Sequence, residues 1–239
     1  MSTSRVVWIT GASSGIGRAL AERFVSQGDT VVATARSLAN LTILQEQLSS
    51  SLGSCAVYQC DVTHEDQVRT TEEAIRSKFG SPDVLINNAG VTYFKDFVNT
   101  TIAEFDEVVG TNLRGLFLTT KAVLPQMLER KKGSIINVLS YAAKTTYTGS
   151  SVYAASKAGA EAMMNVLRAE TREKGINIVN VFPGAVFTSI WHPRHREKYG
   201  HQMMQPSDVA QVVYKLSCEP PGVMIEDVVI RPQVGDLRV

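Results

Sequence analysis

The sequence predicts an α/β protein built on one doubly wound parallel sheet, with helices on both faces of the sheet. Seven short runs rich in Val and Ile alternate with longer segments of helical periodicity along the whole chain. The runs are mostly uninterrupted by polar residues, as expected of parallel strands that are buried on both faces. No repeat, low-complexity run or linker divides the 239 residues, so we expect a single domain over 1–239.

Each strand and helix is expected at a defined place in the chain. The strands are expected at Val6–Thr10, Thr30–Ala35, Cys55–Gln59, Val84–Asn87, Ser134–Leu139, Asn177–Phe182 and Ile225–Ile230. The helices are expected near Gly17–Gln27, Leu38–Leu48, Glu65–Phe79, Ala103–Lys131, Val152–Lys174 and Ser207–Leu216. A kink is expected at Pro125, because a proline removes a helical hydrogen bond. Residues 188–205 show weak periodicity and no clear structure, which is typical of a lid over a site.

The composition narrows the class of protein and of partner. With 44% hydrophobic and 20% charged residues, it is that of a soluble globular protein. The 24 basic and 23 acidic residues leave a formal charge of +1, which favours neither nucleic acid nor a membrane surface as a partner. The three cysteines, Cys55, Cys60 and Cys218, have no framework spacing and indicate a reducing compartment. With no secretory signal and no apolar run of membrane-spanning length, we expect a cytoplasmic protein.

The glycine-rich segment from Gly11 to Gly17, GASSGIG, has two chemical interpretations. It matches the turn that presents a nucleophilic serine in hydrolases, here Ser13, but that turn usually follows several strands and needs a later acid and histidine. It also joins a buried strand to a helix, whose free N–H groups and partial positive charge bind phosphate. The position after the first strand favours phosphate binding, and a tight turn without any ligand is the third interpretation.

A second motif, Tyr153-Ala154-Ala155-Ser156-Lys157, places a phenol and an ammonium four residues apart on one helix face. A neighbouring ammonium favours the phenolate, so the tyrosine pKa is expected to fall from about 10 and the pair can exchange a proton with a substrate oxygen. Ser140, at the end of a buried strand, offers a hydroxyl to orient a carbonyl oxygen. Taken alone, the motif is weak evidence for catalysis, because tyrosine–lysine pairs at this spacing are frequent on helix surfaces.

Together these motifs resemble those of the short-chain dehydrogenase/reductase family in their order and approximate spacing, over nearly the whole chain. The matching segments are TGASSGIG at Thr10–Gly17, Asp61-Val62, Asn87-Asn88-Ala89-Gly90, Asn112, Ser140, Tyr153…Lys157 and Pro183-Gly184. The resemblance implies a Rossmann-type domain with a seven-stranded parallel sheet, which binds a nicotinamide dinucleotide across the carboxyl ends of its strands.

The resemblance also assigns roles to individual residues. The cofactor-binding residues that it implies are Gly11, Ser13, Ser14, Ile16, Gly17, Arg36, Ser37, Asp61, Val62, Asn88, Ala89, Gly90, Tyr153, Lys157, Pro183, Gly184, Val186 and Thr188. In catalysis, Ser140 orients the carbonyl and Tyr153 donates the proton. Lys157 lowers the tyrosine pKa and binds the nicotinamide ribose, and Asn112 holds a water through a kink in its helix.

The residues that follow the second strand predict which dinucleotide is used. Relatives that prefer NAD place an acidic residue there, whereas this chain has Ala35 followed by Arg36 and Ser37. Arg36 can pair with a 2′-phosphate, helped by Ser37 and Ser14, so we expect NADP(H). The alternative is that Arg36 is solvated and stacks on adenine. Some NADP-dependent relatives carry a basic residue at the position of Ser14, which this chain lacks.

We therefore expect an NADPH-dependent carbonyl reductase or alcohol dehydrogenase. The alternatives are 3-oxoacyl-carrier-protein reductase or sepiapterin reductase within the same chemistry, a non-catalytic NADP-binding regulator, and a serine hydrolase that uses Ser13. Segments 183–191 and 231–236 resemble bacterial sepiapterin-reductase-like members, in which case Asp236 anchors an amino-pterin ring if the tail folds over the site.

The substrate, metal and assembly expectations rest on fewer residues. The candidate substrate wall is Ala142, Tyr147 and Trp191, with Val186 beside them. His192-x-x-His195 lacks further ligands at suitable spacing, so we expect no metal. A homodimer or homotetramer is expected to form through the two long helices, 103–131 and 152–174.

Overall fold

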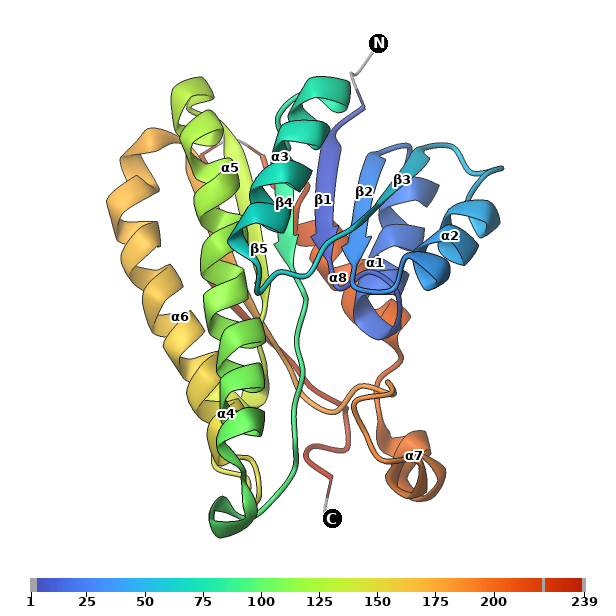
Figure 1. The fold of residues 1–239 in the computed structure, drawn as a ribbon, viewed down its shortest axis with the longest axis vertical. Helices are drawn as coiled ribbons and strands as arrows, with labels where there is room; N and C mark the ends of the chain where they lie inside the picture. The colour runs from blue at the N-terminus through green and yellow to red at the C-terminus, as the bar shows by residue number, and fades with distance from the viewer. Residues whose placement is uncertain (1–3, 221, 238–239) are drawn as a thin grey trace.

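A seven-stranded parallel sheet runs through the middle of the computed structural model, which describes residues 4–220 and 222–237 (Figure 1). The strands are β1 (Val6–Thr10), β2 (Thr30–Ala35), β3 (Ser54–Gln59), β4 (Val84–Asn87), β5 (Gly133–Val138), β6 (Ile176–Pro183) and β7 (Asp227–Ile230). Their order across the sheet is β3-β2-β1-β4-β5-β6-β7, and every neighbouring pair is parallel. The direction of winding reverses between β1 and β4, where doubly wound sheets bind their ligands. The predicted Rossmann-type fold is confirmed.

The helices divide between the two faces of the sheet. They are α1 (Gly15–Ser26), α2 (Leu38–Gln47), α3 (Glu65–Phe79), α4 (Ile102–Val109), α5 (Leu116–Arg130), α6 (Ser151–Thr171), α7 (Pro193–Tyr199) and α8 (Pro206–Leu216). One core joins α1, α2 and α8 to the sheet, and a second core joins α3, α5 and α6 to the opposite face. None of these helices is long and apolar enough to cross a membrane, as far as residues 4–220 and 222–237 are concerned.

One local expectation needs correction. Residues 188–205 are not without structure, because α7 forms within them. Pro193 starts this helix, where its missing N–H is not needed, and the ring nitrogen of His192 accepts a bond from the Arg194 N–H. α5 continues through Pro125 to Arg130, so the kink expected there stays a prediction, and a π-helical segment lies at 110–115 between α4 and α5.

Three buried asparagines hold β4, β5 and β6 together from within. Asn87, Asn137 and Asn180 lie opposite one another in the register of these strands. The Asn87 amide donates to Asn137 and the Asn137 amide donates to Asn180, with N···O distances of 3.0 Å in both bonds. All three side chains are buried. Since each lies within a few residues of the carboxyl end of its strand, the row fixes where those ends lie relative to one another.

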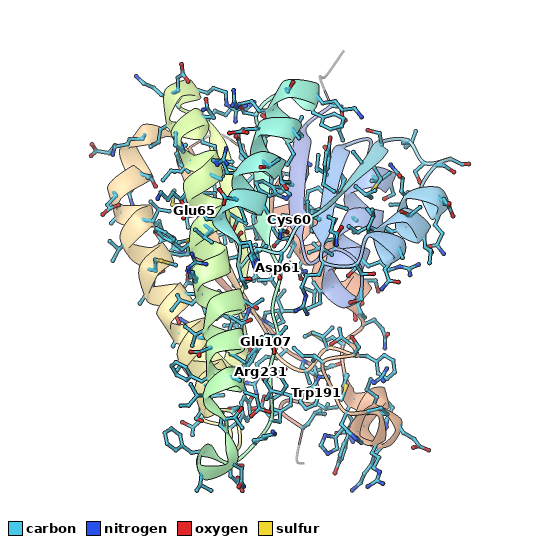
Figure 2. All side chains as sticks on the ribbon, viewed as in Figure 1. Cys60, Asp61, Glu65, Glu107, Trp191 and Arg231 are labelled. Atoms are coloured by element: carbon cyan, nitrogen blue, oxygen red, sulfur yellow. The ribbon has the colours of Figure 1, made fainter. Side chains whose placement is uncertain are left out.

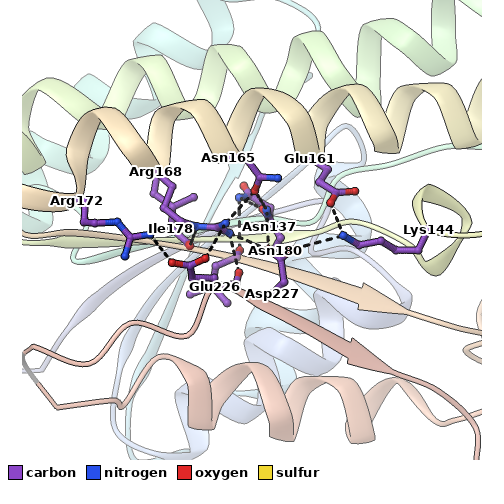
Figure 3. A network of polar contacts seen from close by, with 11 residues as sticks. Asn137, Lys144, Glu161, Asn165, Arg168, Arg172, Ile178, Asn180, Glu226 and Asp227 are labelled. Atoms are coloured by element: carbon purple, nitrogen blue, oxygen red, sulfur yellow. Dashed lines mark hydrogen bonds and ion pairs between the residues drawn. The ribbon is translucent and has the colours of Figure 1, made fainter.

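The row continues into a charged network under α6 (Figure 3). Asn180 donates to Asn165 and Asp227, and the Arg168 guanidinium donates to Asp227 Oδ1 and to the Ile178 carbonyl, both at 2.9 Å. Arg168 is buried, and a buried guanidinium is tolerated only when its donors are paired. The network therefore fastens α6 to β6 and β7.

Replacement of Asn137 by alanine should destabilise the fold. The change removes the two hydrogen bonds of the row and a longer one to the Val179 carbonyl, and it leaves the Asn180 acceptor without its amide partner, which costs about 2 to 4 kcal/mol of unfolding free energy. Urea titration at fixed protein concentration measures this loss. Asn177→Ala in β6 is the matched control, because no side-chain hydrogen bond of Asn177 is present among the described residues. Equal stabilities of the two variants would contradict a structural role for the row.

Candidate active site

The glycine-rich turn after β1 is pinned to the end of β4. Gly11 and Gly15 adopt left-handed φ angles of +64° and +54°, which favour glycine. A Cβ at Gly11 would lie 2.8 Å from the Ala89 Cα, so the two segments touch through their backbones. The Asn88 amide donates to the Thr10 carbonyl at 2.9 Å, and the Thr10 hydroxyl accepts bonds from the N–H groups of Asn88 and Ala89. The turn is therefore fixed before any ligand binds.

The same turn leaves polar groups free to face a phosphate. α1 begins at Gly15 with Ser14 as its N-cap, and the Ser14 side chain makes no capping hydrogen bond. The first N–H groups of this 12-residue helix are then available to an anion. Ser13 has no histidine partner among the described residues, so the arrangement lacks the base that a serine nucleophile needs.

A cavity of about 560 Å³ lies over the carboxyl ends of the strands beside this turn. The predicted cofactor residues that line it are Gly11, Ser13, Ser14, Ile16, Arg36, Ser37, Asp61, Val62, Asn88, Ala89, Gly90, Tyr153, Lys157 and Thr188. Tyr93 and Glu107 also line it, and no motif in the sequence marks either residue. We call this space the dinucleotide cavity.

Four predicted cofactor residues lie elsewhere. Gly17 lines no cavity described here, because it packs beneath the turn, where a Cβ would lie 2.3 Å from the Gly11 carbonyl oxygen. Pro183, Gly184 and Val186 line a neighbouring cavity instead, since β6 lies further from the switch point between β1 and β4. Val186 is also buried against the core.

This second cavity, of about 720 Å³, is mostly apolar, and we call it the substrate cavity. The predicted residues Ala142, Tyr147 and Trp191 line it, and Trp191 stacks on Phe94 with ring centroids 5.4 Å apart. Asp236, in the tail after β7, reaches the same cavity, where it pairs with Arg231 at 2.8 Å. Figure 2 shows Trp191 and Arg231 below the carboxyl edge of the sheet.

Tyr153 stands where the two cavities meet. It lines both of them, and burial raises the pKa of its phenol, while a hydrogen bond with the Ser140 hydroxyl lowers it. The pKa of Tyr153 is raised overall, so the expectation that Lys157 lowers it is wrong, because burial is the larger effect. Instead, Lys157 Nζ donates to the Val138 carbonyl at 2.9 Å and lies 5.9 Å from the centre of the Tyr153 ring. Burial lowers the pKa of Lys157 to about 8, so its positive charge is only partly retained above neutral pH.

Asn112 lines neither cavity, and it connects two parts of the site. The π-helical turn at 110–115 directs its side chain inward, where it is buried. Its oxygen accepts from the Val91 N–H at 2.9 Å, and its amide donates to the Val91 carbonyl and to the Ser156 hydroxyl. Asn112 thereby ties the segment after β4 to the helix that carries Tyr153. Its expected role in holding a water stays a prediction.

No cluster of three His, Cys, Asp or Glu side chains that could hold a metal ion is found in the part of the chain that the structure describes. His192 and His195 lie side by side at α7, with ring centroids 6.2 Å apart.

The fold is a doubly wound α/β sheet, with one cavity over its switch point and a second, mostly apolar cavity beside it. The family model for short chain dehydrogenases matches residues 5–198, so the chain belongs to the short-chain dehydrogenase family. The predicted family is confirmed.

Three known proteins illustrate the similarity. The glycine betaine reductase ATRR of Emericella nidulans is 33% identical over 97% of this chain, which spans only 19% of that protein's length. A metagenomic short-chain oxidoreductase solved with NADP is 31% identical with a TM-score of 0.85, and the match covers 98% of this chain and 99% of the other. A serine dehydrogenase solved with NADP+ is 28% identical with a TM-score of 0.90, over 98% and 97% of the chains.

A methyl group at Gly17 should disrupt the turn, whereas one at Gly159 should not. Both glycines lie inside helices, but a Cβ at Gly17 would meet the Gly11 carbonyl oxygen at 2.3 Å, and a Cβ at Gly159 would meet Leu113 at 3.4 Å. We expect Gly17→Ala to lower the free energy of unfolding by about 1 to 3 kcal/mol. Gly159→Ala should be neutral or stabilise by up to about 1 kcal/mol. Thermal unfolding compares the two, and equal melting temperatures would contradict the close packing.

Proposed function

We propose that this protein is an NADP(H)-dependent carbonyl reductase or alcohol dehydrogenase, with Tyr153 as the proton donor to the substrate oxygen. One observation carries the proposal. Tyr153 lines both cavities, and no other residue shared by them in the described chain has an ionisable side chain. A group in that place can pass a proton to a substrate that lies against the cofactor.

The dinucleotide cavity fits the cofactor in shape and charge. The turn at Gly11 and Gly15 offers a concave backbone surface and helix N–H groups to a pyrophosphate. At the other end, Ala35 puts no carboxylate at the end of β2, and Arg36 and Ser37, which follow it, line the cavity where a 2′-phosphate would lie. The NADP found in two of the similar structures agrees with this assignment. When bound, the cofactor supplies or accepts the hydride.

The chain's own groups supply the rest of the chemistry. The Ser140 hydroxyl holds the substrate oxygen beside the Tyr153 phenol, and the phenol donates its proton to that oxygen as negative charge develops there. Burial keeps the phenol protonated by raising its pKa. Lys157 binds the ribose next to the tyrosine and favours the phenolate that remains after proton transfer, as long as its ammonium keeps its charge.

The substrate cavity favours carbonyl compounds with a flat or bulky apolar group. The stacked rings of Phe94 and Trp191 form an aromatic surface next to Tyr153, whose ring meets Phe94 edge to face with centroids 6.4 Å apart. A pterin substrate is the second candidate, because the tail does bring Asp236 to this cavity. The Asp236 carboxylate is already paired with Arg231, which makes the pterin the weaker proposal. Residues 188–205, which include Trp191, act as the lid.

We also propose that the protein forms a homodimer or homotetramer through α5 and α6. Phe117 on α5 and Val166 on α6 expose 45% and 59% of their surface, and they line a mostly apolar groove of about 530 Å³ between the two helices. A groove of this kind is normally covered by another protein surface. A cytoplasmic location stays a prediction.

Tyr153→Phe should abolish turnover and spare cofactor binding. Loss of the proton donor is expected to lower kcat by about 10² to 10⁴, while the NADPH dissociation constant stays within about twofold. Aldehydes, ketones and pterins are offered with NADPH, and oxidation is followed at the nicotinamide absorbance band. Tyr199→Phe on α7 is the matched control, because Tyr199 lines neither cavity. Near-normal turnover by Tyr153→Phe would contradict the proposed donor.

Val166→Glu should weaken assembly. A carboxylate at this exposed position of α6 must be desolvated in any contact between two copies, so sedimentation velocity should show a shift towards monomer. Ile43→Glu on α2 is the control, because Ile43 is similarly exposed, at 49%, on the opposite face of the sheet. If both variants keep the oligomeric state of the wild type, the α5–α6 surface is not the interface.

A further inference from the structure

A carboxylate lies beside Arg36 in the lining of the dinucleotide cavity. Glu107, near the end of α4, places its Oε1 3.6 Å from the Arg36 Nη1, and both residues line the cavity. Their contact is an ion pair without a hydrogen bond of good geometry. Figure 2 shows Asp61 near the carboxyl ends of the strands and Glu107 below them, and both line the dinucleotide cavity.

Glu107 is held in this place by a second contact. The Tyr93 hydroxyl donates to Glu107 Oε2 at 2.5 Å, and this bond raises the pKa of the Tyr93 phenol. Asp61, the other carboxylate of the wall, accepts two bonds from Thr63 within its own turn. Against the opposing effect of burial, the Thr63 bonds lower the pKa of Asp61, and the charge of Arg36 adds to this lowering. Of these two acids, Glu107 is the one that forms an ion pair with the guanidinium in the part of the chain that the structure describes.

We propose that Glu107 is a cofactor-selectivity residue, which competes with the cofactor 2′-phosphate for Arg36 and so weakens NADP(H) binding relative to NAD(H). This inference rests on the proposed role of Arg36 as the 2′-phosphate ligand. NAD(H) carries a neutral hydroxyl at the same position. A change of charge at Glu107 therefore acts on one cofactor and leaves the other unaffected.

Two opposite effects of Glu107 on Arg36 must be weighed. The ion pair can hold the guanidinium ready for the phosphate, but an exposed pair contributes little, and here the side chains expose 64% and 38% of their surface. A 2′-phosphate brings a charge of about −1.5 to −2 next to the carboxylate, which repels it while drawing on the same guanidinium. Solvent exposure weakens both effects, but the phosphate carries up to about twice the charge of the guanidinium. The net influence of Glu107 in this proposal is therefore to oppose NADP(H).

Glu107→Gln tests the proposal, because it removes the charge and keeps the size of the side chain. Dissociation constants for NADPH and NADH are measured by nicotinamide fluorescence on the full chain at low salt. NADPH should bind about three- to tenfold more tightly, and NADH should stay within about twofold. At about 1 M salt the gain for NADPH should shrink, because the charges are then screened. Asp106→Asn, the neighbouring exposed acid outside the cavity, should change neither constant.

The other outcomes decide against the proposal. If Glu107→Gln binds NADPH and NADH more weakly to the same extent, Glu107 has a structural role. If the NADPH dissociation constant is unchanged or larger, Glu107 does not compete with the 2′-phosphate. Arg36→Gln separates this inference from the proposed function, since it should weaken NADPH at least about tenfold and leave NADH unaffected. If Arg36→Gln weakens NADPH binding as expected but Glu107→Gln does not strengthen it, Glu107 does not compete for Arg36, and the proposed cofactor is unaffected. If Arg36→Gln leaves NADPH unaffected, the cofactor contact itself is wrong.

Discussion

The row of buried amides from Asn87 through Asn137 to Asn180 fixes the carboxyl ends of three neighbouring strands, and the site is built on these ends. Asn88 follows the first amide by one residue and binds the glycine-rich turn through the Thr10 carbonyl. Ser140 follows the second amide by three residues. The two cavities therefore depend on the register of the sheet, and a slip of one residue would turn each amide to the other face.

The same row continues into the contacts that place the helix of Tyr153. Arg168 joins this helix to β6 and β7 through paired buried donors. Asn112 joins it to the segment after β4, by bonds that the π-helical turn makes possible. The helix that carries the phenol is thus fastened at two places by Arg168 and Asn112, which line neither cavity. Rigid support of this kind suits the proposed role of Tyr153 as a proton donor, because proton transfer depends on geometry at the scale of a hydrogen bond.

Burial of Tyr153 and Lys157 shifts the pKa values of both side chains, and it lowers the stability of the fold at neutral pH. It raises the pKa of Tyr153 and lowers that of Lys157 to about 8, from an ordinary value of 10.5. A lysine with a lowered pKa binds its proton less readily in the folded chain than in the unfolded chain. Its contribution to stability therefore rises with pH between these two values, and at neutral pH the fold bears the cost of a desolvated ammonium. Functional sites commonly carry such a cost.

The sequence by itself determined the order of the strands and helices, because buried parallel strands leave continuous apolar runs and a glycine turn needs its glycines at fixed spacing. The sequence also placed predicted site residues such as Asn88 and Ser140 directly after the predicted strands. Only the tertiary structure decided that Gly17 packs beneath the turn and that burial, which outweighs the hydrogen bond with Ser140, raises the pKa of Tyr153. It also brought Glu107 opposite Arg36. These contacts join segments that are far apart in the chain, and neither periodicity nor spacing carries a signal for where a side chain meets such a neighbour.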